Sequence, residues 1–165
     1  MQYYAINLKS GYRNNYAIWC GDDIDHLYVV DGFIPVFKTL NDLVLFAKSS
    51  QMELNLPVSK IDLDRVRVWC KSPSEKIDCN LFLDTWNMLG DIAATYDDLY
   101  ESFESMTDKY LSEYRKLFAG NNIKALRGNN PKYHPKWDND EVNNIKEIMN
   151  YGFSLFKKKC RRVSV

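Results

Sequence analysis

The sequence predicts an α+β fold, in which a small N-terminal antiparallel sheet packs against a C-terminal set of long helices. Short alternations of apolar and polar residues, separated by turn residues, fill the β-rich part over residues 1–70. In the helical part, residues 80–158, large apolar residues recur at intervals of three and four, which is typical of amphipathic helices. A polar loop at 71–78 separates the two parts. At this length we expect a single domain over 1–165.

The N-terminal strands follow from alternation. Residues 2–8 (QYYAINL) and 16–20 (YAIWC) are rich in strand formers, and the turn residues between them predict an antiparallel hairpin. Residues 26–30 predict a third short strand. Residues 34–38 predict a fourth, which Pro35 confines to a sheet edge or a strand start.

The segment that follows is predicted to be a helix and then a connection. Thr39 is the candidate cap of a helix with an apolar stripe that ends near residues 49–50. Residues 51–57 are predicted to be a connection. For residues 65–70 (RVRVWC) the alternation of charge and bulk predicts a strand, with a short helix as the alternative.

The central stretch, residues 80–119, places its large apolar residues on one side of a helix without a proline. Forty residues exceed a usual globular helix, so we expect two helices or a kink near 95–98. Prolines and asparagines predict a loop over 121–139. A last helix is expected over 142–158, capped by Asp138 and Glu141, before a frayed basic tail, residues 157–165.

Charge is segregated along a chain that carries 22 basic and 22 acidic residues. Residues 84–113 hold eight acids and one lysine, whereas residues 115–136 hold six bases and no acid. A solvated helix face is one interpretation of the acidic stretch, and a docking surface for a basic partner is the other. The zero net charge disfavours a protein that coats nucleic acid.

Motifs for catalysis, metal binding and secretion are missing. The four cysteines have no CxxC spacing, and no Walker loop, GxGxxG or GxSxG sequence is present. His26 lies beside Asp22, Asp23 and Asp25, but such a polar group favours an ordinary turn over a metal or acid–base site. No signal peptide or membrane span is indicated. We therefore expect a cytoplasmic protein that is not an enzyme and uses no metal or cofactor.

Several segments together resemble a known family. They are IDLDRVRVW at 61–69, ID at 77–78, LDTWNMLGDIA at 83–93, GNNIKAL at 120–126 and PKW at 135–137. Over about residues 61–156 the chain resembles the small immunity proteins of bacterial contact-dependent growth inhibition and related polymorphic toxin systems. The resemblance implies a cytosolic single-domain protein that binds the C-terminal domain of one cognate toxin, commonly a nuclease, and blocks it.

The acidic stretch fits that mechanism independently, because carboxylates can occupy the place of a nucleic-acid backbone on a basic toxin. The acids expected to steer and hold the toxin are Asp84, Asp91, Asp97, Asp98, Glu101 and Glu104. Tyr96, Tyr100 and Trp137 are candidate apolar anchors, although Tyr96 and Tyr100 also belong to the predicted core stripe. The turn with Asp22, Asp23 and Asp25 is a second candidate patch.

Two further possibilities stay open. The competing function is a nucleic-acid-associated accessory protein that uses the basic residues 115–136 and the C-terminal tail. Dimerisation through the aromatic helices is also open, because Tyr100, Phe103 and Tyr110 need a neighbour.

Overall fold

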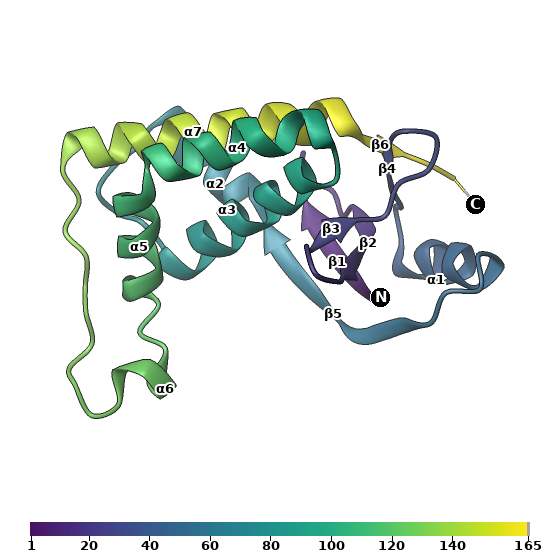
Figure 1. Cartoon of the computed structure of the whole chain (residues 1–165), viewed down its shortest axis with the longest axis horizontal. Coiled ribbons are helices and arrows are strands. Elements are labelled where there is room, and N and C mark those ends of the chain that lie inside the picture. The colour runs from purple at the N-terminus through teal and green to yellow at the C-terminus, as the bar shows by residue number, and fades with distance from the viewer. Residues whose placement is uncertain (165) are drawn as a thin grey trace.

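The computed structural model describes residues 1–164 and confirms the α+β fold, with the sheet beside a group of helices (Figure 1). In chain order the elements are β1 (Gln2–Lys9), β2 (Tyr16–Gly21), β3 (His26–Leu27), β4 (Ile34–Val36), α1 (Leu40–Ser49), β5 (Leu54–Asp62), α2 (Leu63–Lys71), α3 (Cys79–Ala94), α4 (Asp97–Lys109), α5 (Leu111–Gly120), α6 (Lys124–Arg127), α7 (Asn139–Lys159) and β6 (Cys160–Arg162). Long α7 runs along the helical side, against α3.

The sheet is mixed, which corrects the expectation of an antiparallel one. Its strand order is β3-β2-β1-β5; β1 and β2 form the predicted hairpin, but β5 runs parallel to β1. The connection predicted at 51–57 is wrong, because β5 begins at Leu54. Pro57 hides this strand, although Leu54, Leu56 and Val58 alternate with the residues between them, and the pairing with β1 defines it. β4 pairs with β6 in a separate two-stranded sheet.

The segment predicted as a strand at 65–70 is helix α2, the alternative structure. The Asp62 side chain caps it by accepting a hydrogen bond from the Arg65 backbone N–H at 3.3 Å. Leu63, Val66 and Cys70 are buried, and their spacing lies on one helical face. Packing of this face against the core therefore overrides the alternating pattern.

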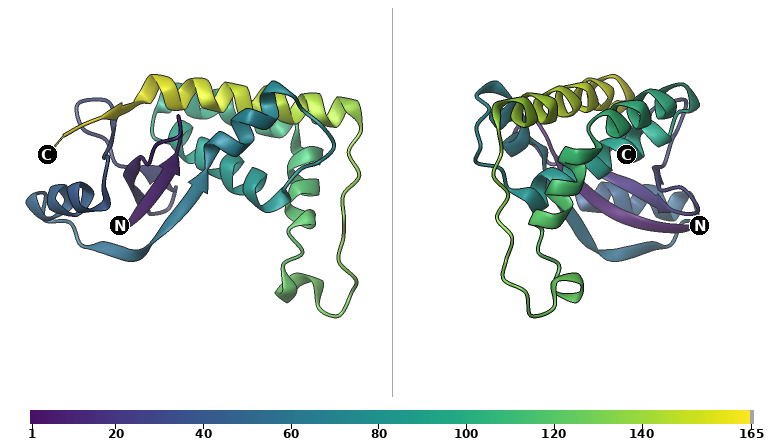
Figure 2. Two further views of the ribbon diagram at one scale, coloured as in Figure 1. Left: turned by 180° about the vertical axis from the view of Figure 1, so that it is seen from behind. Right: turned by 60° about the vertical axis from the view of Figure 1, so that its left-hand side comes forward.

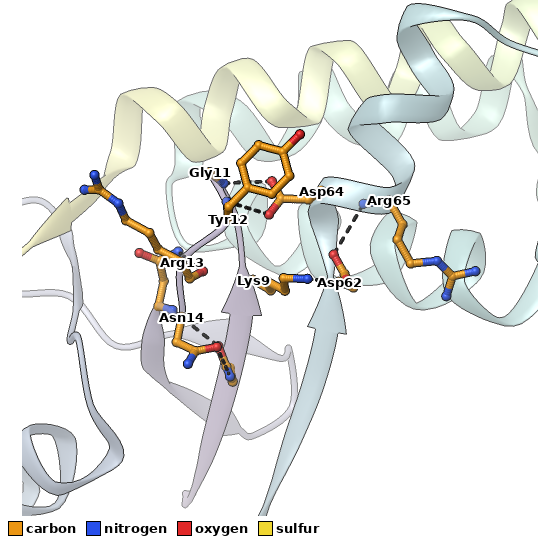
Figure 3. Close-up of polar contacts among 10 residues, drawn as sticks. Lys9, Gly11, Tyr12, Arg13, Asn14, Asp62, Asp64 and Arg65 are labelled. Atoms are coloured by element: carbon orange, nitrogen blue, oxygen red, sulfur yellow. Dashed lines mark hydrogen bonds and ion pairs between the residues drawn. The ribbon is translucent and has the colours of Figure 1, made fainter.

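A polar contact fixes the β1–β2 turn to α2 (Figure 3). Gly11 and Tyr12 have positive φ angles of 64° and 58°, so their consecutive backbone N–H groups point the same way. Both donate to the carboxylate of Asp64, at 2.7 and 2.8 Å. Lys9 pairs with Asp62 at 3.1 Å beside this contact. The buried carboxylate thereby joins the hairpin to the helical side.

The central stretch breaks twice. The predicted break is confirmed, because α3 ends at Ala94 and α4 begins at Asp97. The second break, at Tyr110, was not predicted, because the apolar spacing continues through it. Tyr110 is buried and its hydroxyl donates to Glu147 on α7, so a tertiary contact accompanies the bend.

The last helix begins as predicted and crosses α3 closely. Asp138 and Glu141 form a capping box at the start of α7. At the crossing, a Cβ atom on Gly152 would lie 2.4 Å from Cδ1 and 2.8 Å from Cβ of Leu89. Only a glycine permits this approach of the two helices.

The prediction that the C-terminal tail is frayed is wrong. Cys160–Arg162 forms β6, and three of the five tail bases have partners. Lys159 lies over the Tyr96 ring at 3.9 Å, and Arg161 lies over the Phe33 ring at 3.6 Å. Arg162 donates to the Asn14 carbonyl at 2.8 Å and to Asn15 Oδ1 at 2.9 Å. Only Val165 of this tail lies outside the described residues.

Two further features of the chain are the hydropathy of its helices and the state of its cysteines. Within residues 1–164, no helix combines the length and the apolar character needed to cross a membrane. The four cysteines are free, and burial raises the pKa of Cys20 and Cys70 to about 11. These two thiols are therefore packing groups of low reactivity.

Candidate protein-interaction cleft

An open cleft of about 650 Å³ lies between α3 and α4 and is completed by the β2–β3 turn and the start of α5. Four carboxylates line it, and none of its lining residues within 1–164 is a lysine or arginine. They are Asp25, Asp91, Glu104 and Asp108. Aromatic residues form much of the remaining wall, namely Trp19, Trp86, Tyr100, Phe103 and Tyr114. We call this feature the acidic cleft.

The walls of the acidic cleft are held by their own contacts. The buried Trp86 on α3 donates its indole N–H to Thr107 Oγ1 on α4 at 3.1 Å. Tyr114 on α5 donates its hydroxyl to Asn87 Oδ1 at 2.8 Å and meets the Trp86 ring edge-on, with centroids 5.4 Å apart. The cleft is therefore shaped without a ligand.

Asp91 lies where the sheet meets α3. Its Oδ2 atom accepts a hydrogen bond from the Trp19 indole at 2.9 Å. The pKa of Asp91 is raised to about 6, mainly by burial and to a smaller extent by nearby Asp25, against the opposing effects of the Trp19 hydrogen bond and of His26. At neutral pH the carboxylate is thus mainly ionised in surroundings that disfavour its charge, and a cation placed in the cleft would relieve that penalty.

The β2–β3 turn is brought to the cleft by Thr95 at the end of α3. Thr95 Oγ1 accepts from the Leu27 backbone N–H at 3.0 Å and donates to the Asp91 carbonyl at 2.8 Å. This contact places Asp25 in the lining next to Asp91. One residue of the predicted turn patch, Asp25, therefore meets two acids of the predicted helical patch, Asp91 and Glu104.

A second hollow of about 450 Å³ adjoins the acidic cleft and shares Trp19, Asn87 and Asp91 with it. Asp84 and Lys60 are among its other lining residues. Burial, with a contribution from Asp78, raises the pKa of Asp84. Asp84 thus extends the acidic surface toward β5, although Lys60 makes this hollow less negative than the cleft.

The remaining predicted site residues lie elsewhere. Among the predicted acids and anchors, Asp25, Asp91, Tyr100 and Glu104 line the cleft itself. Asp84 lines the second hollow, and the other predicted acids, on α4 and in the turn, are in neither lining and are exposed to solvent: Asp22, Asp23, Asp97, Asp98 and Glu101.

Two predicted anchors need correction because their rings are engaged inside the chain. Trp137 is only 9% exposed and lies under Lys116, whose Nζ is 4.8 Å from the ring centroid. Tyr96 donates its hydroxyl to the Gly32 carbonyl at 3.2 Å and packs against the core and Lys159. Burial and nearby Cys160 raise the pKa of Tyr96 to about 12. Both rings are thus already in contact with groups of the same chain.

The same reasoning applies to dimerisation through the aromatic helices. Phe103 and Tyr110 are buried in the chain's own core, and only Tyr100 keeps exposed surface. Phe103 stacks on Tyr151 of α7, with ring centroids 6.1 Å apart. The neighbours that these rings need are supplied by the same chain.

Sequence reasoning missed several cleft residues. Asp108 lies four residues after Glu104, a spacing that places both on one helical face and could have found it. Trp19 and Tyr114 come from a strand and from another helix, and no local signal connects them with α4.

The arrangement is suited to binding a cationic side chain between carboxylates and aromatic faces. No group of three or more His, Cys, Asp or Glu side chains in residues 1–164 is placed to hold a metal ion. Comparisons of the chain with protein-family models, with curated proteins and with solved structures find no match.

Proposed function

We propose that this chain is an immunity protein, which binds and neutralises a cognate toxin domain of a contact-dependent growth inhibition system in the cytoplasm. Neutralisation occurs by direct contact, without catalysis. The observation that carries the proposal is the acidic cleft, in which four carboxylates and several aromatic rings surround a preformed opening with no base in its lining.

The chemistry of the cleft favours a basic protein partner. A lysine or arginine that enters it would meet Asp91, whose ionised form is disfavoured by burial, and would pack against Trp19 or Tyr100. Truncating one member of a desolvated charge pair typically weakens a complex by about 2–5 kcal/mol, so the cleft carboxylates are the side chains whose loss the complex should feel most.

A nuclease is the toxin that suits the cleft best. A nuclease must present bases where it holds the phosphates of its substrate. Carboxylates that pair with those bases prevent the nucleic acid from binding there. The exposed acids of α4, including Asp97, Asp98 and Glu101, would add long-range steering toward such a surface.

The nucleic-acid alternative has less support. Lys159, Arg161 and Arg162 of the tail have intramolecular partners, and among the described residues only Lys157 and Lys158 of the tail bases have none. The acidic cleft would also repel a phosphate backbone.

The test is a protection assay with the toxin-like domain encoded beside the gene for this chain. Co-expression should restore growth, and titration calorimetry should give a one-to-one complex. The variant Glu104→Lys/Asp108→Lys should lose protection and weaken binding by at least about a hundredfold, since two attractive contacts become repulsive.

The matched control is Glu53→Lys/Glu75→Lys, which changes net charge equally at two exposed residues outside the cleft lining. This variant should protect as well as the wild type. Equal binding by the cleft variant and the control would remove the cleft mechanism, and a lack of any complex with the neighbouring domain would remove the immunity function.

A further inference from the structure

A second surface with the opposite charge lies on the arm, which we define as residues 118–136. It contains the end of α5, the short α6 and the following loop, and both Figure 1 and Figure 2 show it projecting from the helical side. The two limbs of the arm are joined at Asn122. Its side chain donates to the Tyr133 carbonyl at 2.8 Å and accepts from the Tyr133 backbone N–H at 2.6 Å. The arm therefore has a defined shape.

The arm exposes apolar surface that the rest of the chain leaves uncovered. A hollow of about 270 Å³ lies among its residues, and four large side chains around it are between 42% and 70% exposed. They are Phe118, Ile123, Leu126 and Tyr133. A cluster of this kind on a projecting segment marks an interaction surface.

The charge of the arm indicates what covers it. The arm, residues 118–136, contains four bases and no acid, and Arg115 and Lys116 lie just before it. Lys116 is paired with Glu141 at 2.7 Å, whereas Lys124, Lys132 and Lys136 are exposed and form no ion pair within residues 1–164. The partner surface is therefore expected to be acidic, with aromatic or apolar groups among its carboxylates.

The acidic cleft of the same molecule has this composition. It contains four carboxylates, no base and five aromatic residues. We propose that the arm of one copy occupies the acidic cleft of a second copy. Because the chain carries equal numbers of acids and bases, no net repulsion keeps two copies apart.

The position of α5 makes reciprocal exchange feasible. Leu111 and Tyr114 at its start line the cleft, and Phe118 near its end belongs to the arm. A helix of ten residues is about 15 Å long, so cleft and arm lie near one another on each copy. A twofold axis can then seat both arms at once and form a closed, self-complementary dimer.

This dimer would occupy the cleft to which the proposed function assigns the toxin, so the two complexes exclude each other. In the free protein the cleft of each copy would be occupied by the arm of the other copy, and a tighter-binding toxin would displace that arm by mass action. The self-association stands on the two surfaces alone and does not depend on the identity of the toxin.

Sedimentation velocity over about a hundredfold range of protein concentration tests the proposal, at low and high salt. The wild type should form a dimer that dissociates as salt rises. Lys124→Glu/Lys132→Glu/Lys136→Glu in the arm should raise the dissociation constant at least about tenfold, and so should Glu104→Lys/Asp108→Lys in the cleft. The control Lys38→Glu/Lys76→Glu/Lys158→Glu, at exposed bases outside the arm, should dimerise like the wild type.

Mixing the two reversed variants gives the decisive result. Each variant alone places like charges together, but in a mixed dimer the acidic arm meets the basic cleft and the basic arm meets the acidic cleft. The mixture should therefore recover dimerisation.

A wild type that stays monomeric throughout would overturn the proposal, as would a mixture that fails to associate. A labelled single-stranded oligonucleotide that binds the wild-type monomer and is lost by the arm variant would assign the arm to nucleic acid instead. Toxin binding is read separately, because the arm variant keeps its cleft and should bind the toxin as the wild type does.

Discussion

Replacing Asp91 by asparagine tests whether the acidic cleft holds a carboxylate at the expense of stability. The substitution keeps the shape of the side chain and an oxygen that accepts the hydrogen bond from Trp19, but it removes the charge. The pKa of Asp91 rises on folding from 3.8 to about 6, mainly because burial disfavours the ionised form.

The sign and size of the effect follow from linkage. Between these two pKa values the folded state binds more protons than the unfolded state, so the contribution of Asp91 to stability falls as pH rises. That contribution is fully present below the unfolded pKa and is lost above about pH 6. At about 1.4 kcal/mol per pH unit, the ionised side chain lowers the free energy of unfolding by about 3 kcal/mol.

Urea denaturation of both proteins at two pH values measures this difference. Asp91→Asn should be more stable than the wild type by about 3 kcal/mol at pH 8 and by only about 1 kcal/mol at pH 4.5. Glu104→Gln, at an exposed carboxylate of the same cleft, should change stability by less than about 0.5 kcal/mol at either pH.

A stability difference that is the same at both pH values, or an asparagine variant that is the less stable at pH 8, would refute the reasoning. Either result would mean that the carboxylate is already satisfied inside the fold. A cation in the cleft would then not relieve any desolvation penalty at Asp91, and the strongest support for a basic partner would be lost.

Three other predictions follow from the same structure. Binding of a basic toxin domain should weaken as pH falls through about 6, because Asp91 becomes protonated and loses its charge. Calorimetry at pH 5 and pH 7.5 would detect this change in affinity. An affinity independent of pH would exclude Asp91 from the contact. Asp64→Ala should lower the free energy of unfolding by about 2 kcal/mol, since it leaves the N–H groups of Gly11 and Tyr12 without their acceptor, and a change below about 0.5 kcal/mol in urea would contradict the role of this turn. Gly152→Ala should destabilise the chain by about 1–3 kcal/mol through overlap with Leu89. Gly90→Ala on α3, where the nearest atom would lie 3.4 Å from the added Cβ, should change stability by less than about 1 kcal/mol. Similar thermal shifts for the two variants would disprove the tight crossing.

The parts of the fold that the sequence predicted are those with local signals. Thr39 caps α1, and Asp138 with Glu141 caps α7, because cap chemistry is decided within one turn of helix. Long-range pairing was not predictable in the same way. β5 pairs with β1 and β6 pairs with β4, and in each case the partner strand lies far away in the chain.

The candidate site also has parts that could be predicted from the sequence and parts that could not. Its acidity was evident from the sequence, and Asp91, Glu104 and Tyr100 do line the cleft. Their meeting with Asp25 depends on Thr95, which bonds β3 to the end of α3, a contact between residues far apart in the chain. Burial of Trp137 was equally inaccessible, because an aromatic residue in a polar loop has the same local sequence whether it packs inward or faces solvent.

The close crossing at Gly152 has a kinetic consequence for recognition. Because α3 packs closely against α7, α3 cannot shift when a partner binds, and the cleft is already open before binding. Association of a partner with the monomer should then proceed in one step, at a rate set by diffusion and by the attraction of the acidic surface. This rate should fall steeply as ionic strength rises, while the dissociation rate stays nearly constant.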